Sequence, residues 1–298
     1  MYSYTNGNAL INLESDGTRT IEYDGALNLD YPLNLDIRVQ SICSLGYNPK
    51  TGKAVCSFCH ESATTDGNEC DYEQLLSKLI GLPKGIEIAI GCNIFTDGFK
   101  YFLEKCKEFG YCCNVTVNQL SINKYQDELK DAVENGLIKG LGISYRSSNF
   151  NIPQFFRDCE NTVIHVIAGI DDIEDIMKLD VKKILVLGEK DFGFNKGNVN
   201  LESQSHKKWF WYLRKLFDIF DIVSFDNLAL EQLKVKRFIP DDQYAVFYQG
   251  EYSFYINAVN QTFSRSSRSP DIVAWDISIP EYFKSIMDVQ YEKRRIKP

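Results

Sequence analysis

The sequence predicts an α/β fold: a partial or complete (β/α) TIM-like barrel with mostly parallel strands, an N-terminal β-hairpin and a C-terminal extension. Strand and helix patterns alternate about eight times, as a parallel sheet with crossover helices requires. The predicted strands end in polar or small residues, and active sites of barrels lie at these ends. The 298 residues suffice for one large domain or two smaller ones.

The chain divides into three predicted parts. Residues 9–13 and 18–23 flank an Asp-Gly turn, which predicts a hairpin, and we interpret residues 1–34 as an added flap. Residues 35–235 form the predicted barrel core. Residues 236–298 are a C-terminal extension that completes or covers the barrel, with a helix opening at residues 240–242.

The elements of the core follow from hydrophobic periodicity and from turn residues. Asp71 is a suitable N-cap, and Gly81 and Pro83 stop the helix that it begins. The predicted strands are 35–42, 86–90, 112–117, 138–143, 163–167, 183–187 and 222–225, with a last one at 252–258. The predicted helices are 72–80, 97–109, 125–135, 151–158, 173–179 and 209–220.

Charge and composition exclude several classes of function. A formal net charge of -8 and a pI near 5.1 argue against broad binding to nucleic acid, which depends on clustered Lys and Arg. The longest apolar runs fall short of the roughly 20 residues that span a bilayer. The first residues lack the basic and apolar regions of an export signal. We therefore expect a cytoplasmic protein with no membrane partner and with reduced thiols.

Three cysteines gather on the loop after the first core strand. Cys56 and Cys59 can direct both sulfurs at one metal centre, and the Gly- and Pro-containing loop can fold back to bring in Cys43. Thiolates suit zinc or iron-sulfur iron. Three thiolates on a cubane cluster leave one iron open to a substrate or cofactor. The other cysteines lie mostly on apolar faces and are expected in the core: Cys70, Cys92, Cys106, Cys112, Cys113 and Cys159.

Two other interpretations of these cysteines remain. Zinc could be held by the three thiolates with His60 as the fourth ligand. Alternatively, Cys43 is a buried structural cysteine, and only Cys56 and Cys59 are functional. These two could also form a thioredoxin-like redox pair, although the strand-to-helix setting of that fold is missing.

The cysteine loop after the first strand, the glycine-containing turn after the second and the repeated βα units resemble the radical S-adenosylmethionine (SAM) superfamily. Members usually carry Cys-x3-Cys-x2-Cys, whereas this chain has twelve residues between the first two cysteines, as if residues 47–55 were inserted. Segments 56–62, 88–93, 115–119 and 224–229 also resemble a less characterised group of radical-SAM-like proteins of bacteria and their phages. The resemblance covers residues 35 to about 267.

The resemblance implies a cofactor, a cosubstrate and a reaction. Cys43, Cys56 and Cys59 would hold three irons of a 4Fe-4S cluster, and the fourth iron would bind the amino and carboxylate groups of SAM. An external donor such as flavodoxin or ferredoxin would supply one electron. Reductive cleavage of SAM would then lead to hydrogen abstraction from a small-molecule or peptide substrate that no feature of the sequence identifies.

The resemblance also implies residues that contact SAM. Gly91 and Asn93 match the turn that meets the methionine amino group, with Cys92 in place of the usual glycine. Phe58 matches the aromatic residue whose backbone contacts adenine. Asn118 and Ser144 match ribose-contacting positions, and Gly169 and Gly188 fall near the adenine.

Lys190 and Asp191 follow a predicted strand and are candidate substrate contacts or catalytic residues. A salt-bridged loop end explains them equally well. The alternative function is a zinc-binding protein, or a catalytically inactive cluster-bearing protein, that serves in interactions.

Overall fold

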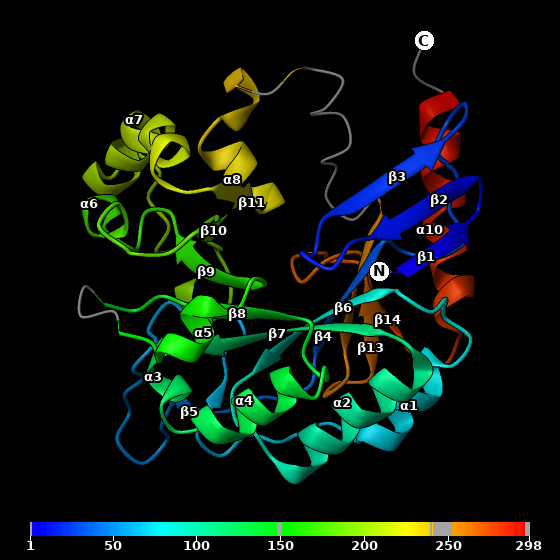
Figure 1. The fold of residues 1–298 in the computed structure, drawn as a ribbon, viewed down its shortest axis with the longest axis horizontal. Helices are drawn as coiled ribbons and strands as arrows, with labels where there is room; N and C mark the ends of the chain where they lie inside the picture. Colours follow the sequence, from blue (N-terminus) through cyan, green and yellow to red (C-terminus); the bar gives the residue numbers. More distant parts are fainter. Residues whose placement is uncertain (1, 148–150, 239, 241–251, 296–298) are drawn as a thin grey trace.

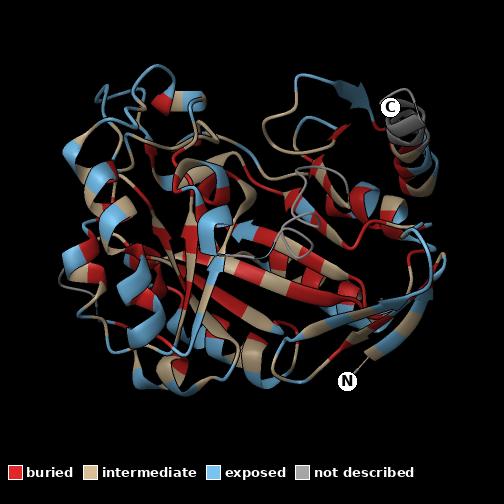
Figure 2. Ribbon diagram, turned by 90° about the horizontal axis from the view of Figure 1, so that it is seen from above, coloured by how far each residue is buried: buried red, intermediate tan, exposed pale blue. Residues whose placement is uncertain are grey.

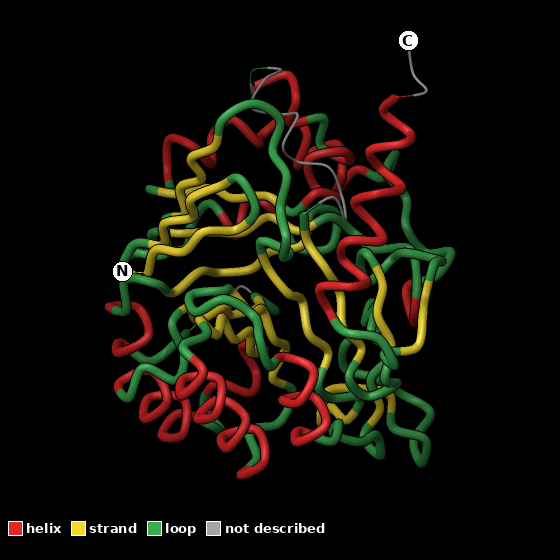
Figure 3. The backbone as a smooth tube through the Cα atoms, turned by 90° about the vertical axis from the view of Figure 1, so that its right-hand side faces the viewer, coloured by secondary structure: helices red, strands yellow, loops and turns green. Residues whose placement is uncertain are grey.

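A computed structural model describes residues 2–147, 151–238, 240 and 252–295. A ten-stranded sheet with helices outside it dominates the fold (Figures 1 and 3). Seven parallel strands lie in it in sequence order: β4 (Asn34–Arg38), β6 (Glu87–Cys92), β7 (Cys112–Asn118), β8 (Gly140–Ser144), β9 (Thr162–Ile167), β10 (Lys183–Leu187) and β11 (Ile222–Phe225). The predicted α/β fold with a mostly parallel sheet is thus confirmed.

The sheet continues on the other side of β4. There β12 (Ser253–Asn257) pairs parallel to β4, and β13 (Thr262–Ser264) and β14 (Ile272–Ala274) follow antiparallel. Among the described residues, β11 and β14 are the two edges of the sheet and do not pair with each other. Closure into a partial or complete barrel therefore stays a prediction.

Helices connect the parallel strands, as the alternating pattern predicts. They are α1 (Tyr72–Leu79), α2 (Asp97–Phe109), α3 (Gln119–Ile122), α4 (Gln126–Glu134), α5 (Gln154–Asp158), α6 (Ile173–Ile176), α7 (Gln204–Ile219) and α8 (Asn227–Gln232). Asp71 caps α1, and Gly110 ends α2 with a φ of 83°. None of the helices in the described ranges is long and apolar enough to cross a membrane.

Several predicted boundaries are wrong or lie outside the described residues. The helix predicted at 151–158 begins at Gln154, and the strand predicted at 138–143 begins at Gly140. The first core strand ends at Arg38 rather than at residue 42, because the chain turns there into β5 (Ile42–Tyr47). The helix predicted to reach residue 179 ends at Ile176. Of the helix predicted to open at residues 240–242, residues 241 and 242 lie outside the described part.

The two faces of the parallel strands differ. One face packs against the helices and is apolar: Leu35 and Ile37 of β4 are fully or almost fully buried and belong to the same core as Phe99 and Trp209. Buried segments run along the central strands in Figure 2. Because side chains alternate along a strand, the residues between them point to the other face. We call this the polar face. It carries Asn34, Asp36, Arg38, Thr116, Asn118, Ser144 and His165.

The N-terminal residues form a separate antiparallel sheet of β1 (Tyr2–Asn6), β2 (Ala9–Leu13) and β3 (Arg19–Tyr23). The predicted hairpin is β2 and β3, while β1 and the C-terminal helix α10 (Ile279–Arg295) were not predicted. This sheet lies beside α10 (Figure 1), and Ile11 and Phe283 share its small core. Arg19 pairs with Glu87 at 2.7 Å, at the start of β6, so the small sheet lies at the N-terminal edge of the large one.

Candidate metal and cofactor site

The loop after β4 brings the three predicted cysteine ligands together. Cys43 lies in β5, and residues 48–53 then make a tight turn. The chain returns along β5, where the Cys56 amide donates to the Leu45 carbonyl oxygen at 3.2 Å. One turn later the Cys59 amide donates to the Cys56 carbonyl oxygen at 3.2 Å. Residues 47–55 therefore form a local turn, and Cys43 and Cys56 are neighbours.

The three thiols are free and half-buried, and each lies within the electrostatic influence of another. Burial raises the pKa of the Cys43 thiol, and a negative charge on Cys56 or Cys59 raises it further. Burial also raises the pKa of Cys56, while the positive charge of Arg146 opposes this. The Asn118 amide donates to Cys56 Sγ at 3.9 Å. The donors from Arg146 and Asn118 thus oppose the rise in the pKa of Cys56 without reversing it.

Within the described ranges, no group of three or more Cys, His, Asp and Glu side chains is close enough to hold one metal ion. Each thiolate of a cubane binds a different iron, so its sulfurs stand farther apart than ligands of one zinc. His60 Nε2 lies 3.2 Å from Glu61 Oε1 and 3.1 Å from Lys190 Nζ. The imidazole is therefore engaged away from the thiols.

The turn after β6 is fixed by a residue that the sequence analysis missed. The amides of Asn93 and Ile94 donate to Gln40 Oε1 at 2.9 and 3.1 Å. Gln40 Nε2 in turn donates to the Ile94 carbonyl oxygen at 2.7 Å and to Glu69 Oε1 at 2.8 Å. Nothing would contact a side chain at Gly91 within 4 Å. The predicted methionine-binding turn is thus held rigidly, with open space at Gly91.

Asn118 and Ser144 lie side by side at the ends of β7 and β8, and Ser144 is in register with His165 of β9. The His165 ring extends over Gly142, where an added methyl group would lie 2.6 Å from Cε1. The described residues form no hydrogen bond to this ring, and burial together with Arg146 lowers the pKa of His165 to about 4. A neutral imidazole therefore lies beside the two predicted ribose contacts.

Gly169 and Gly188 pack against protein side chains. Gly169 has a φ of 92°, and a methyl group there would lie 2.2 Å from Nε2 of the buried His206. A methyl group at Gly188 would lie 2.4 Å from Leu228 Cγ. Backbone conformation and close packing account for both glycines. Their position near adenine stays a prediction.

Phe58 and Arg146 connect the cysteine loop to the end of β8. The Arg146 guanidinium lies over the Phe58 ring, with Cζ 5.0 Å from its centroid. Arg146 Nη1 donates to the Tyr145 carbonyl oxygen, whereas the buried Nε has no hydrogen-bond partner. Arg146 thus contacts Cys56 and Phe58 while keeping one buried donor unused.

Lys190 joins the site, and Asp191 does not. The loop after β10 packs on the cysteine loop, since the Phe194 amide donates to the Cys59 carbonyl oxygen at 3.0 Å. Lys190 Nζ lies 3.1 Å from His60 Nε2 and donates to Ser267 Oγ at 3.3 Å. The exposed Asp191 accepts from the Gly197 amide at 2.6 Å and so stabilises its own loop.

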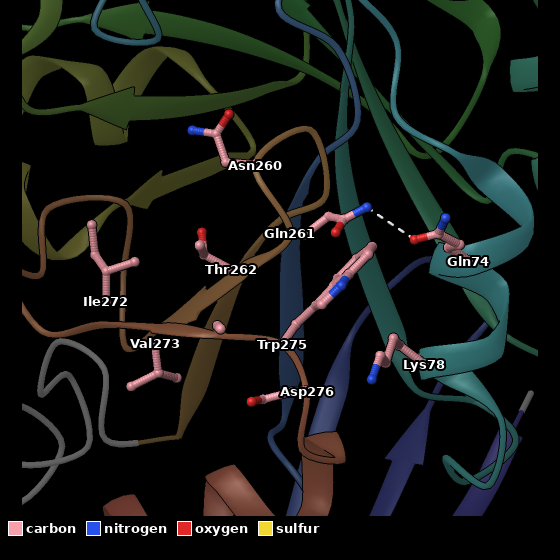
Figure 4. Close-up of a pocket in the computed structure, with 10 residues that line it drawn as sticks. Gln74, Lys78, Asn260, Gln261, Thr262, Ile272, Val273, Trp275 and Asp276 are labelled. Carbon is pink, nitrogen blue, oxygen red and sulfur yellow. Dashed lines mark hydrogen bonds between the residues drawn. The ribbon is translucent and has the colours of Figure 1, made fainter.

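Three surface pockets described in the structure lie elsewhere. One, of about 630 Å³, lies between α1 and the β13–β14 pair, where Gln261 donates to Gln74 at 2.9 Å beside Trp275 (Figure 4). A second, of about 730 Å³, lies at β11, and a third, of about 210 Å³, lies at α5. No predicted site residue lines any of the three.

No protein-family model matches the chain, and no curated protein matches it.

Proposed function

We propose that the protein is a radical SAM enzyme that uses a 4Fe-4S cluster to cleave SAM reductively. The observation that carries the proposal is the convergence of Cys43, Cys56 and Cys59 on the loop after the first of seven consecutive parallel strands. Ligands in α/β sheets bind beyond the carboxyl ends of the strands, and the cysteine loop is at this edge.

Each residue around the thiols has a defined role in this proposal. Cys43, Cys56 and Cys59 hold the cluster, which supplies the electron for cleavage of the sulfonium when it is bound. Arg146 and Asn118 place N–H donors on the Cys56 sulfur and stabilise its negative charge.

The neighbouring turn positions the cosubstrate. Gln40 fixes the backbone of Asn93 and Ile94 through three hydrogen bonds of 2.7 to 3.1 Å. Carbonyl oxygens held in this way accept hydrogen bonds from an ammonium group without further ordering. Gly91 leaves the adjacent space open.

The test begins with iron, sulfide and zinc content after reconstitution without oxygen. Dithionite and SAM are then added, and 5′-deoxyadenosine is measured. We expect iron, sulfide and 5′-deoxyadenosine in the wild type and their loss in Cys56→Ala. Cys159→Ala is the matched control, because Cys159 is also half-buried but ends α5. Zinc in place of iron would refute the proposal, and iron without cleavage would indicate an inactive cluster-bearing protein.

A further inference from the structure

Asp36 is an acidic residue in the middle of a central strand. It lies on the polar face of β4, in register with Ala89 of β6 and Tyr255 of β12. Solvent reaches its side chain, although protein surrounds it closely enough for burial to raise the pKa of the carboxyl. The polar face is therefore not filled at this position. Among the described residues Asp36 forms no ion pair, and the Asn34 side chain hydrogen-bonds to it.

Lys190 is a cation facing the same space. Its ammonium contacts His60 and Ser267 but is ion-paired with no carboxylate in the described part of the chain. His60 Nε2 lies 3.1 Å from Lys190 Nζ and 3.2 Å from Glu61 Oε1. Glu61 pairs with Arg38, which is on the same face of β4 as Asp36. Burial raises the pKa of both Asp36 and Asp226, and the charge of Lys190 opposes this rise in both. Asp36 and Lys190 thus carry opposite charges in one region without forming a direct pair.

The other charges around them already have partners. Arg38 Nε pairs with Glu61 Oε2 at 2.9 Å, and the Tyr255 hydroxyl donates to the same oxygen at 3.3 Å. Asp226 Oδ1 accepts from the amides of Gly188 and Ala229 at 2.9 and 2.7 Å, and so caps α8. These groups stabilise the fold, whereas Asp36 and Lys190 can each still pair with a charged group of a ligand.

We propose that Asp36 and Lys190 bind the two ends of a small zwitterionic substrate, its ammonium or amidinium group at Asp36 and its carboxylate or phosphate group at Lys190. A ligand with the reverse arrangement of charges pairs with both groups at once. Ala89 and Gly91 on the neighbouring strand leave room beside Asp36. This inference rests on the proposed function, because it names the substrate class of that site.

The test measures equilibrium binding of simple probes by calorimetry on the reconstituted full-length protein. The zwitterions are 4-aminobutyrate and 3-aminopropyl phosphate, which separate the carboxylate and phosphate forms, and the matched single charges are butylamine and butyrate. We expect each zwitterion that binds to have an affinity about tenfold or more above that of butylamine and of butyrate. Asp36→Asn should weaken zwitterion and butylamine binding about tenfold and leave butyrate unchanged.

Lys190→Met should weaken binding of the zwitterions and of butyrate and leave butylamine binding unchanged. It also serves as a second test if Asp36→Asn does not fold. Equal binding of all four probes, or unchanged zwitterion binding in both variants, would overturn the inference. Formation of 5′-deoxyadenosine by the wild type is measured in the same preparation. Zwitterion binding without this product would refute the proposed function alone, and the product without zwitterion binding would refute this inference alone.

Discussion

The N-terminal and C-terminal edges of the large sheet, at the two ends of its parallel strands, carry different polar groups. At the N-terminal edge, the small sheet supplies partners: Arg19 pairs with Glu87, and the Ser15 and Asp16 carbonyl oxygens accept from Asn161 and Lys183 at 2.8 and 3.4 Å. At the C-terminal edge, the three thiols are free, and Arg146 Nε is buried without a partner. Asn161 Oδ1 and Thr162 Oγ1, at the N-terminal edge, are also buried without a hydrogen-bond partner. The two edges therefore differ chiefly in the three free thiols and in the small sheet that covers only one of them.

Under the proposed function, the free thiols make the C-terminal edge the one that binds ligands. A buried polar group without a partner costs about 1 to 3 kcal/mol, and a ligand that accepts from Arg146 Nε would recover this cost. At the N-terminal edge, the ion pair and hydrogen bonds with the small sheet contribute to stability. Substitutions at the C-terminal edge should therefore change metal content and SAM affinity. Substitutions at the N-terminal edge should change only the free energy of unfolding.

The largest effect is expected at Cys43, which tests whether the insertion removes it from the site. Cys43→Ala should abolish iron binding almost completely, because Cys43 is next to Cys56 despite the twelve intervening residues. Iron per chain is the measurement, and the thermal midpoint is the control. Full iron content with a lowered midpoint would show that Cys43 is only a structural residue.

Gln40→Ala should weaken SAM binding about tenfold to a hundredfold, since it frees the amides of Asn93 and Ile94. Iron content should not change. The Kd for SAM is measured by calorimetry, with Gln74→Ala as the control because Gln74 is an exposed glutamine of α1. An unchanged Kd in the Gln40 variant would separate this turn from SAM binding.

His165 should make the protein sensitive to acid. Its pKa is about 4 in the folded state, below the ordinary 6.5, so the unfolded chain takes up the proton first as the pH falls. The free energy of unfolding should drop between pH 6.5 and pH 4 by on the order of 2 kcal/mol. Burial raises the pKa of Asp171 to about 6, which opposes this loss, so the variant must be compared with the wild type.

His165→Gln should remove the loss that is due to the imidazole. Chemical denaturation at several pH values measures it. A variant with the same pH dependence as the wild type would contradict a lowered pKa at His165.

The smallest effect is expected at the N-terminal edge. Arg19→Ala should lower the free energy of unfolding by about 1 kcal/mol, because the pair with Glu87 is partly exposed to solvent. Iron content and SAM binding should stay at the wild-type level. A loss of either would break the distinction between the two edges.

Local patterns predicted most of the parallel strands and the helices between them. Periodicity gave the strands at β7, β10 and β11, and Asp71 marked the start of α1. The loop carrying Cys56 and Cys59 was correctly placed after the first core strand. β13, β14 and α10 were missed, as was β1.

The remaining site residues depend on contacts that the sequence pattern does not show. Asp36 and Lys190 are far apart in the sequence, and only the folded sheet places them in the same region. Gln40 acts through a turn more than 50 residues later, as its contact with Asn93 shows. The alternation of Asp36 with Leu35 and Ile37 was a usable signal, because it places a carboxylate on the face opposite the core.

The most direct test of the account is electron paramagnetic resonance of the dithionite-reduced protein with and without SAM. A cluster held by Cys43, Cys56 and Cys59 has one iron without a protein ligand, so we predict a reduced-cluster signal that changes when SAM is added. A reduced-cluster signal that SAM does not alter, or a protein that binds zinc and gives no signal, would contradict the claim that this edge of the sheet binds SAM at an open iron.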